Sequence, residues 1–377
     1  MRIGFDASVA GGQPGGTGTY AVQLLSSLIR LRPEWTFLLY FRDTGEDNPL
    51  LTAPHAANVQ RVKVPVRTNA AYVQVELPRR LARDAVDVYH SPGYFLPLRW
   101  RGDKVVTIHD LNMFLQLRHW MHREKFLAWL DLAIETPLSV RVARRIIVDS
   151  EWAKHDVCRI LRARRDRVRV IPLAPDTFFD QAPSAAEVAC ARAVAQGQRF
   201  ILFVGILSPQ KNLKGLLSAF AASGLGQQGM RLVLAGADHE GYSRTIREIA
   251  ARLQIADSVV VAGYVARSTL RALYAEALCL VLPSHGEGFG LPMVEAMARG
   301  TPIVAADRQA LPEVLGSGGC LFDPNEVGQL SSLLQRIAGD DAFRSELAQR
   351  ARERRQAFSW EQTANATAAV YEEIHAG

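Results

Sequence analysis

The sequence predicts an α/β protein built from two parallel-sheet domains of similar size. Its 377 residues exceed what one ordinary hydrophobic core organises, since domains usually hold about 100–200 residues. Short apolar runs alternate along the chain with longer amphipathic stretches, which is the pattern of buried parallel strands covered by helices. A loop-like stretch from Pro175 to Pro183 separates two series of such runs. We therefore expect an N-terminal domain over residues 1–180 and a C-terminal domain over 181–357.

The predicted strands divide into two series. The first consists of Arg2–Phe5, Thr36–Phe41, Val105–Ile108, Arg145–Val148 and Arg169–Ile171. The second consists of Phe200–Val204, Arg231–Ala235, Ser258–Ala262, Cys279–Leu282 and Pro302–Ala305. Two such domains place a cleft between them, and ligands of open α/β sheets bind beyond the carboxyl ends of the strands. Polar groups that directly follow a strand are therefore the candidate site residues.

The composition is typical of a globular protein and excludes a disordered or fibrous one, with 48% hydrophobic and 22% charged residues. No apolar run approaches the ~20 residues of a membrane span, and residues 1–10 lack a signal-peptide pattern. Four cysteines lie far apart without CxxC pairing, so we expect small buried residues in a reducing, cytoplasmic compartment: Cys158, Cys190, Cys279 and Cys320.

Charge is unevenly distributed between the two halves of the chain. Residues 1–180 contain 26 Lys and Arg against 19 Asp and Glu, a net of +7, whereas residues 181–377 contain 18 against 19. The excess favours an anionic partner for the first half, and an ordinary basic surface explains it equally well. No nucleic-acid-binding module accompanies it, so we expect no nucleic-acid partner.

A glycine-rich segment, 11–18, follows the first predicted strand and precedes a helix expected from about Thr19. Glycines let backbone N–H groups approach a phosphate, and a helix start adds its positive end. Gly16-x-Gly18-x-x-Ala21 also satisfies the dinucleotide fingerprint, with Asp43 near the position of a ribose-binding acid. About ten residues separate the fingerprint from its strand, although it should open from the strand directly. A dinucleotide-dependent oxidoreductase and a structural loop both remain as alternatives.

Two further polar groups follow predicted strands. His109 and Asp110 come directly after Val105–Ile108, where a His can meet a ligand or simply cap the next helix. In the segment VGILSPQKNL, a strand ends at Gly205 and a proline turn presents Lys211 at a helix start. A Lys in this position provides a compact charge for a diphosphate.

The strongest signal is the segment from Glu287 to Glu295, which reads EGFGLPMVE. Pro292 suits the first turn of a helix that we expect to run to about Gly300. The glycines before it deliver free N–H groups to the helix N-terminus, which is an anion site. We place Glu287 on the loop and Glu295 in the first turn, facing one pocket. The preference of a helix N-terminus for acidic side chains would explain Glu295 alone, but it does not explain both glutamates.

These residues resemble the GT4 family of retaining glycosyltransferases, which have the GT-B fold. The resemblance rests on Glu287-x7-Glu295 and on further segments along nearly the whole chain. They are VGILSPQKNL at 204–213, ALPEV at 310–314, the glycine loop at 15–18, HDL at 109–111, VDSEWAKHDV at 148–157 and FSWEQTA at 358–364. The resemblance implies that residues 358–377 form a terminal helix crossing back to the N-terminal domain, which binds the acceptor.

The resemblance also implies a nucleotide-diphosphate sugar as donor and assigns roles to residues. Glu295 would hold the ribose hydroxyls, Glu287 the donor sugar and Lys211 the diphosphate, with His109 near the anomeric centre. The predicted catalytic residues are His109, Glu287 and Lys211. The predicted donor-binding residues are Gly15, Gly16, Gly205, Lys211, Val265, Glu287, Gly288, Phe289, Gly290, Leu291 and Glu295. No Asp-x-Asp pair occurs in the chain, so neither a metal nor another cofactor is expected.

One departure concerns the arginine that the family commonly carries near this lysine, because Ile206 and Gln210 stand at those positions. A non-catalytic sugar-nucleotide-binding protein is therefore a further alternative. The VGILSPQKNL turn most resembles bacterial polysaccharide-building members, and we expect mannose from GDP-mannose and a glycan or lipid-linked glycan acceptor. Residues 118–129 mix basic and apolar side chains and form either a packed helix or a peripheral contact with the inner face of a membrane. His119 and His122 lack partners for a metal site.

Overall fold

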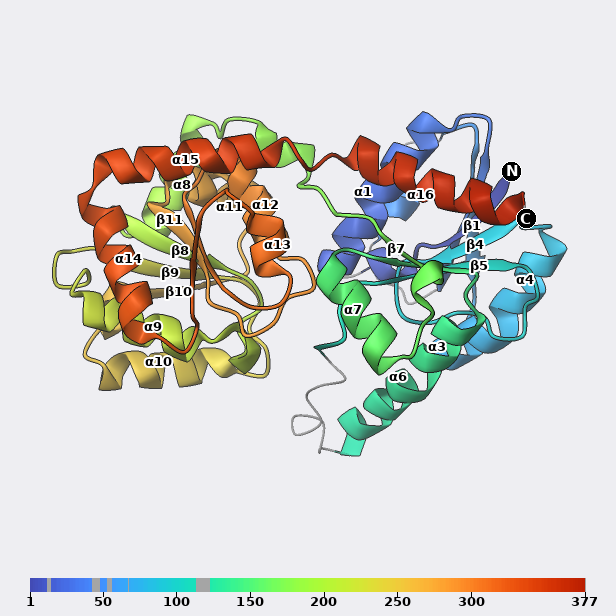
Figure 1. The fold of residues 1–377 in the computed structure, drawn as a ribbon, viewed down its shortest axis with the longest axis horizontal. Helices are drawn as coiled ribbons and strands as arrows, with labels where there is room; N and C mark the ends of the chain where they lie inside the picture. Colours follow the sequence, from blue (N-terminus) through green and yellow to red (C-terminus); the bar gives the residue numbers. More distant parts are fainter. Residues whose placement is uncertain (12–14, 43–47, 53–55, 67, 113–122, 377) are drawn as a thin grey trace. The chain divides into compact units, whose positions relative to one another are not determined.

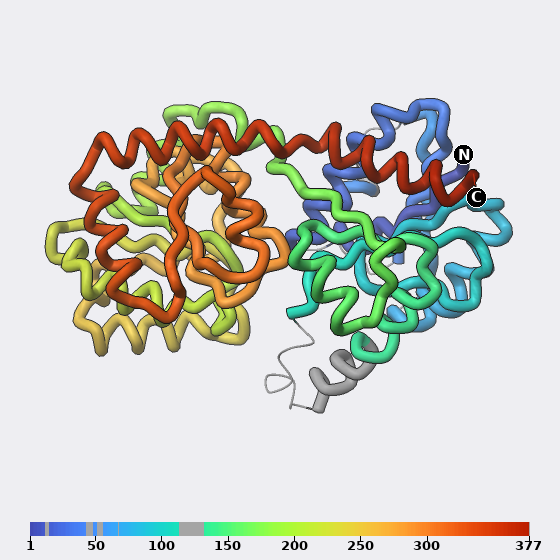
Figure 2. The backbone as a smooth tube through the Cα atoms, viewed as in Figure 1, coloured from blue at the N-terminus to red at the C-terminus, as the bar shows by residue number. Residues whose placement is uncertain are grey.

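The computed structural model describes residues 1–377 except 12–14, 43–47, 53–55, 67, 113–122 and 377, and excludes the side chains of 51–52 and 123–131. The chain forms two compact units (Figure 1). Unit 1 comprises Met1–Leu173 together with Ser359–Gly377, and unit 2 comprises Ala174–Phe358. Both chain termini therefore lie in unit 1 (Figure 2). The stretch Pro175–Pro183, expected as the linker, belongs to unit 2.

Unit 1 contains a parallel sheet of seven strands among the described residues, in the order β3-β2-β1-β4-β5-β6-β7. The strands are β1 (Arg2–Asp6), β2 (Thr36–Arg42), β3 (Val59–Val64), β4 (Val88–Ser91), β5 (Asp103–Ile108), β6 (Arg145–Val148) and β7 (Val168–Val170). Their helical connections are η1 (Ser8–Ala10), α1 (Gly16–Leu31), α2 (Pro49–Thr52), α3 (Asn69–Ala71), η2 (Tyr72–Glu76), α4 (Leu77–Arg83), α6 (Arg123–Val142), α7 (Glu151–Ile160) and η4 (Arg165–Arg167). All carboxyl ends of the strands therefore meet at one edge of the sheet.

The centre of this sheet is buried on both faces, as expected for a parallel sheet covered by helices. β2 reads TFLLYFR, and its five middle residues are buried. The last helix, α16 (Trp360–His375), packs beside α1 in the same unit (Figure 1). Eight of its residues are buried, so α16 is a structural part of unit 1.

Unit 2 contains a second parallel sheet, with six described strands in the order β10-β9-β8-β11-β12-β13. The strands are β8 (Phe200–Val204), β9 (Arg231–Ala235), β10 (Val259–Gly263), β11 (Cys279–Leu282), β12 (Ile303–Ala306) and β13 (Cys320–Phe322). Its helices are η5 (Thr177–Asp180), α8 (Ala185–Val194), η6 (Pro209–Lys211), α9 (Leu213–Ser223), α10 (Tyr242–Arg252), η7 (Ala256–Ser258), α11 (Arg267–Glu276), α12 (Leu291–Arg299), α13 (Leu311–Leu315), α14 (Val327–Gly339) and α15 (Asp341–Arg355). In Figure 1, α8 lies beside α11, and α9 lies beside α14.

The prediction of two parallel-sheet α/β domains is confirmed, and all ten predicted strands occur with nearly the predicted bounds. The sequence reasoning missed β3, β4 and β13. It also placed the start of the first long helix near Thr19, whereas α1 begins at Gly16. The expectation that all four cysteines are buried holds for Cys279, whereas Cys158 and Cys320 are partly buried and Cys190 is exposed. Within the described parts of the chain, no helix has the length and apolar character that crossing a bilayer requires.

Candidate functional site

The N-terminus of α12 in unit 2 is shaped by a glycine. Gly290 adopts φ +87° and ψ +54°, a left-handed conformation, immediately before the first helical residue, Leu291. A Cβ at Gly290 would lie 2.9 Å from Leu311 Cδ2 and 3.0 Å from Met293 Cε, so both the conformation and the packing favour glycine. Pro292 occupies the first turn, and no side chain caps the helix. The positive end of α12 is thus available to an anion.

Lys211 and Glu287 come together beside this helix. Lys211 Nζ lies 2.6 Å from Glu287 Oε1, and Ser284 Oγ donates to the same oxygen at 2.8 Å. The side chains of Lys211 and Glu287 are 19% and 16% exposed, so the pair is partly shielded from water without being sealed from it. The structure therefore unites two predicted catalytic residues that are far apart in the sequence.

The turn that carries Lys211 depends on a close approach between two strand ends. Gly205 N donates to Ala235 O at 3.0 Å, and Leu207 N donates to Ala237 O at 2.8 Å. A Cβ on Gly236, which has φ +152°, would lie only 1.8 Å from Gly205 O. A glycine at 236 is therefore required for the ends of β8 and β9 to approach each other, which directs the chain toward η6 and Lys211.

Glu295 lies on the same helix but in its second turn, whereas the sequence reasoning placed it in the first turn. The Tyr274 hydroxyl donates to Glu295 Oε2 at 2.7 Å. Burial raises the pKa of Glu295 to about 7, although the hydrogen bond from Tyr274 and the charge of Arg267 lower it. Asp176 raises it further, and Asp176 is itself paired with Arg267. The carboxyl group therefore changes charge near neutral pH.

In unit 1, His109 follows β5 and faces a buried carboxylate. Its Nδ1 lies 2.7 Å from Oδ2 of Asp149, which directly follows the neighbouring strand β6. Burial is the largest influence on the pKa of His109 and lowers it, but Asp149, Asp110 and the Pro92 carbonyl together outweigh burial, so the pKa is raised. The Pro92 carbonyl also favours the protonated ring, although Nε2 makes no hydrogen bond of ordinary geometry among the described residues. The contacts with Asp149 and Pro92 thus hold the His109 ring in one orientation, and its Nε2 is buried.

A buried network holds the other side of the His109 ring. Tyr20 from α1 packs edge-on against His109 with ring centroids 4.8 Å apart, and its hydroxyl lies 2.9 Å from Thr107 Oγ1. His90 Nε2 lies 2.8 Å from the same Thr107 oxygen, and His90 Nδ1 lies 2.5 Å from the Tyr371 hydroxyl. Burial lowers the pKa of His90 to about 3, with a further contribution from His109. The network therefore connects Tyr371 of α16, through His90 and Thr107, to the Tyr20 ring that packs against His109.

The predicted site residues divide between the two units. Gly15, Gly16 and His109 belong to unit 1, and the others belong to unit 2. Gly15 is the N-cap of α1 in extended backbone, and it has room for a Cβ. Val265 lies between β10 and α11 and is partly exposed, whereas Phe289 is buried against Phe358, with ring centroids 5.8 Å apart. The roles of these residues in donor binding stay predictions.

Other predicted features lie apart from these groups. Gly18 lies inside α1, where a Cβ would be 3.2 Å from Val9 O, so its smallness serves helix packing. Asp43 and residues 118–122, with His119 and His122, lie outside the described residues. Among the residues that are described, no group of three or more His, Cys, Asp or Glu side chains is placed to hold a metal ion.

Comparison with known proteins identifies the family. Residues 14–177 match the model described as Glycosyltransferase Family 4, and residues 191–354 match the model described as Glycosyl transferases group 1. The chain is a family 4, group 1 glycosyltransferase. It is therefore an enzyme, and the alternatives of an oxidoreductase and a non-catalytic binding protein give way to glycosyl transfer.

Individual relatives agree with this assignment. The chain is 29% identical over 300 residues to O-antigen chain mannosyltransferase B of Escherichia coli, covering 78% of this glycosyltransferase and 77% of the relative. Among solved structures, sucrose-phosphate synthase from Thermosynechococcus elongatus has a TM-score of 0.75 at 22% identity, covering 100% and 99% of the two chains. Anabaena HepE in complex with UDP and glucose has a TM-score of 0.71 at 20% identity, covering 98% and 99%. These similarities confirm the GT-B fold.

The sequence reasoning missed three side chains that hydrogen-bond to predicted site residues: Asp149, Tyr274 and Ser284. Asp149 had a usable signal, because it directly follows a predicted strand, as His109 does. Ser284 follows β11 after one intervening residue, Pro283. Tyr274 is fully buried within α11, and nothing in the spacing of its neighbours indicates contact with Glu295.

Proposed function

We propose that this glycosyltransferase transfers a hexose, with retention and without a metal ion, from a nucleotide-diphosphate sugar to a glycan or lipid-linked glycan acceptor. The observation that carries the proposal is the arrangement of Lys211, Glu287 and Glu295 around the open N-terminus of α12. It combines a positive end for phosphates with two carboxylates that accept hydrogen bonds from hydroxyl groups.

Each group has a separate task in the proposed donor complex. Lys211 and the amides of α12 stabilise the diphosphate, which gains charge as the bond to the sugar breaks. Glu287 accepts hydrogen bonds from sugar hydroxyls, and Glu295 accepts them from the ribose. Residues 174–358, which carry all of these groups, are accordingly the donor-binding part of the chain.

The proposed reaction needs no covalent enzyme intermediate. The bond from the anomeric carbon to the diphosphate oxygen breaks, and the electron pair leaves with the diphosphate. The acceptor hydroxyl attacks the anomeric carbon from the same face, and its proton passes to the departing phosphate oxygen. We assign His109, oriented by Asp149, to the transferred sugar, and the remainder of unit 1 to the acceptor.

Mannose from GDP-mannose is the donor that we propose, and polysaccharide synthesis is the process. The O-antigen chain mannosyltransferase B relative supports both. The HepE complex with UDP and glucose supports a nucleotide sugar in general, but a different base and hexose. The second candidate donor is therefore UDP-glucose. We propose a cytoplasmic location with peripheral membrane contact through the basic N-terminal half.

A thermal-shift screen of GDP-, UDP-, dTDP- and ADP-sugars identifies the donor, because a ligand stabilises the state that binds it. The melting temperature should rise most with GDP-mannose, and Lys211→Ala should abolish the rise. Turnover is then followed as nucleoside diphosphate release in the presence and absence of EDTA, and the anomeric configuration of the product is read by NMR. If another nucleotide sugar raises the melting temperature most, the proposed base or sugar of the donor is wrong. Loss of turnover in EDTA, or an inverted anomeric centre, refutes the proposed mechanism.

A further inference from the structure

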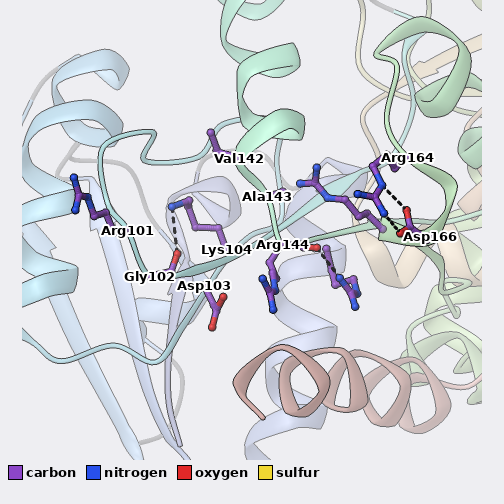
Figure 3. A pocket seen from close by; sticks show the side chains of 11 residues that line it. Arg101, Gly102, Asp103, Lys104, Val142, Ala143, Arg144, Arg164 and Asp166 are labelled. Atoms are coloured by element: carbon purple, nitrogen blue, oxygen red, sulfur yellow. Dashed lines mark hydrogen bonds and ion pairs between the residues drawn. The ribbon is translucent and has the colours of Figure 1, made fainter. Parts of the chain in front are cut away.

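A basic pocket of about 420 Å³ lies in unit 1, away from all the groups described above. Residues from three segments line it: 101–104, 142–145 from the end of α6 onward, and 164, 166 and 167 around η4. Six cationic side chains contribute to the lining, and Figure 3 shows most of them around the hollow: Arg101, Lys104, Arg144, Arg145, Arg164 and Arg167. Asp103 and Asp166 are its only carboxylates among the lining residues.

The pocket lies at the opposite edge of the sheet from His109. β5 begins at Asp103, in the pocket, and His109 follows its other end. A strand of six residues spans about 17 Å. β6 likewise begins at Arg145, in the pocket, and ends before Asp149. The pocket is therefore separate from the site at the carboxyl edge.

Part of the positive charge already has partners. Arg164 forms two hydrogen bonds to Asp166, at 3.1 and 2.5 Å, which Figure 3 shows as dashed lines. Arg145 pairs with Glu373 of α16 at 2.5 Å. Lys104 Nζ donates to backbone carbonyls, including Gly102 O at 3.2 Å. These contacts fix the walls of the pocket.

Other donors in the pocket form no hydrogen bond with a described carboxylate. Arg167 donates to the carbonyls of Val140 and Arg141, both at 3.2 Å, rather than to a carboxylate. The side chains of Arg101 and Arg144 form no hydrogen bond or ion pair with a described residue, and both residues are exposed. Arg145 Nε is buried and also lacks a hydrogen-bond partner in the described part of the chain.

The crowding of like charges has an energetic cost. Burial lowers the pKa of Arg167, and the neighbouring charges of Arg164, Arg145 and Arg144 lower it further, against an opposing contribution from Asp166. A guanidinium group has a pKa above 12, so these groups stay charged and repel one another. An anion bound among them would convert this repulsion into attraction.

We propose that this pocket binds a phosphate-bearing ligand through Arg101, Arg144 and Arg167. Guanidinium groups match phosphate geometry with paired N–H donors, and these three form no ion pair with a described carboxylate. The volume falls within the usual range for small-molecule ligands and exceeds the space that one phosphate ion needs. Both a soluble phosphorylated compound and the headgroup of an anionic lipid provide this chemistry.

The test is hydrogen–deuterium exchange of the full chain with inorganic pyrophosphate as the probe. Exchange reports each segment separately, so binding at the proposed donor site in unit 2 does not obscure the result. We expect slower exchange in segments 101–104, 143–145 and 164–167. The variant Arg101→Ser/Arg144→Ser should bind pyrophosphate in this pocket roughly tenfold or more weakly, through the loss of two charge-assisted contacts. Its affinity for the nucleotide-sugar donor, which we place in unit 2, should be unchanged.

A matched control removes two arginines elsewhere in unit 1. Arg79→Ser/Arg159→Ser eliminates the same charge from side chains that are 72% and 58% exposed and do not line the pocket.

A second arm replaces pyrophosphate with phosphatidylcholine vesicles with and without phosphatidylglycerol. Protection of the three segments by anionic vesicles identifies a lipid headgroup as the source, and protection by pyrophosphate alone identifies a soluble ligand. No protection in either arm, or equal protection in Arg101→Ser/Arg144→Ser, overturns the proposal.

Discussion

The hydrogen bond from Tyr274 to Glu295 provides a quantitative test of the donor site. On the proposed role of Glu295, its ionised form accepts hydrogen bonds from the donor ribose, so donor affinity should rise with pH. Burial places the pKa of Glu295 at about 7. Below that pH the carboxyl group is protonated and loses acceptor capacity, so affinity should be lower at pH 6 than at pH 8. Glu295→Gln should bind weakly at both pH values.

Tyr274→Phe should shift this profile to higher pH. The hydroxyl donates to Glu295 Oε2 at 2.7 Å and favours the charged form. A hydrogen bond to a charged group contributes about 1.5–3 kcal/mol, and one pKa unit corresponds to about 1.4 kcal/mol. Losing it should raise the pKa by at least about one unit, from about 7 to about 8. The ionised fraction at pH 7 then falls from about a half to about a tenth, which weakens donor binding about fivefold at that pH.

Titration calorimetry of the nucleotide sugar between pH 6 and 9 measures the effect without requiring an acceptor. Affinity of Tyr274→Phe should approach that of the parent by pH 9. Tyr242→Phe is the matched control, because this tyrosine lies on α10 and its hydroxyl forms no hydrogen bond with a described residue. A Tyr274→Phe profile that superimposes on the parent profile, or a pH dependence that persists in Glu295→Gln, would refute the reasoning.

Three further results are expected. Lys211→Ala should slow nucleoside diphosphate release by ~10²–10³-fold. Lys214 is exposed, and Lys214→Ala should leave the rate unchanged. Equal rates in the two variants would show that Lys211 has no part in the mechanism. Asp149→Asn should lower the NMR-measured pKa of His109 and reduce kcat about tenfold or more, whereas an unchanged pKa would contradict the pairing. His90 has a pKa of about 3 in the folded protein and ~6.5 in the unfolded chain, so between these pH values it takes up a proton on unfolding. The free energy of unfolding should therefore decrease as the pH falls, by about 2 kcal/mol at pH 5 relative to neutral pH. Urea unfolding of His90→Asn should show a flatter pH profile, and identical slopes would exclude this origin.

The elements that the sequence predicts well are those whose burial is continuous. β8 reads FILFV, and four of its five residues are buried, so an apolar run locates it. β3 reads VQRVKV and lies at the edge of its sheet, with five of its six residues only partly buried or exposed. β4 has four residues that include a buried His and Ser, and β13 has only three residues. Short and edge strands carry less hydrophobic signal than long central ones, although β7, with three residues at an edge of its sheet, is still predicted.

The site shows the same division between local and long-range information. Pro292 and Gly300 locate α12 because proline and glycine have local conformational preferences at helix ends. The contact of Lys211 with Glu287 joins residues 76 positions apart, and only the fold determines it. The contact of Tyr274 with Glu295 depends on how α11 packs against α12, which periodicity within either helix does not specify.

The Lys211–Glu287 pair bears on how the site distinguishes a donor from the released nucleoside diphosphate. Before a ligand binds, Glu287 already neutralises Lys211 at 2.6 Å, which reduces the attraction of Lys211 for a diphosphate. Ile206 and Gln210 stand where the family commonly has an arginine, so α12 supplies the other positive element. A bare nucleoside diphosphate would meet Glu287 without giving it a hydrogen-bond donor, whereas a sugar nucleotide offers hydroxyl groups to the same carboxylate. On the proposed function, Glu287 therefore favours the intact donor over the product and promotes product release.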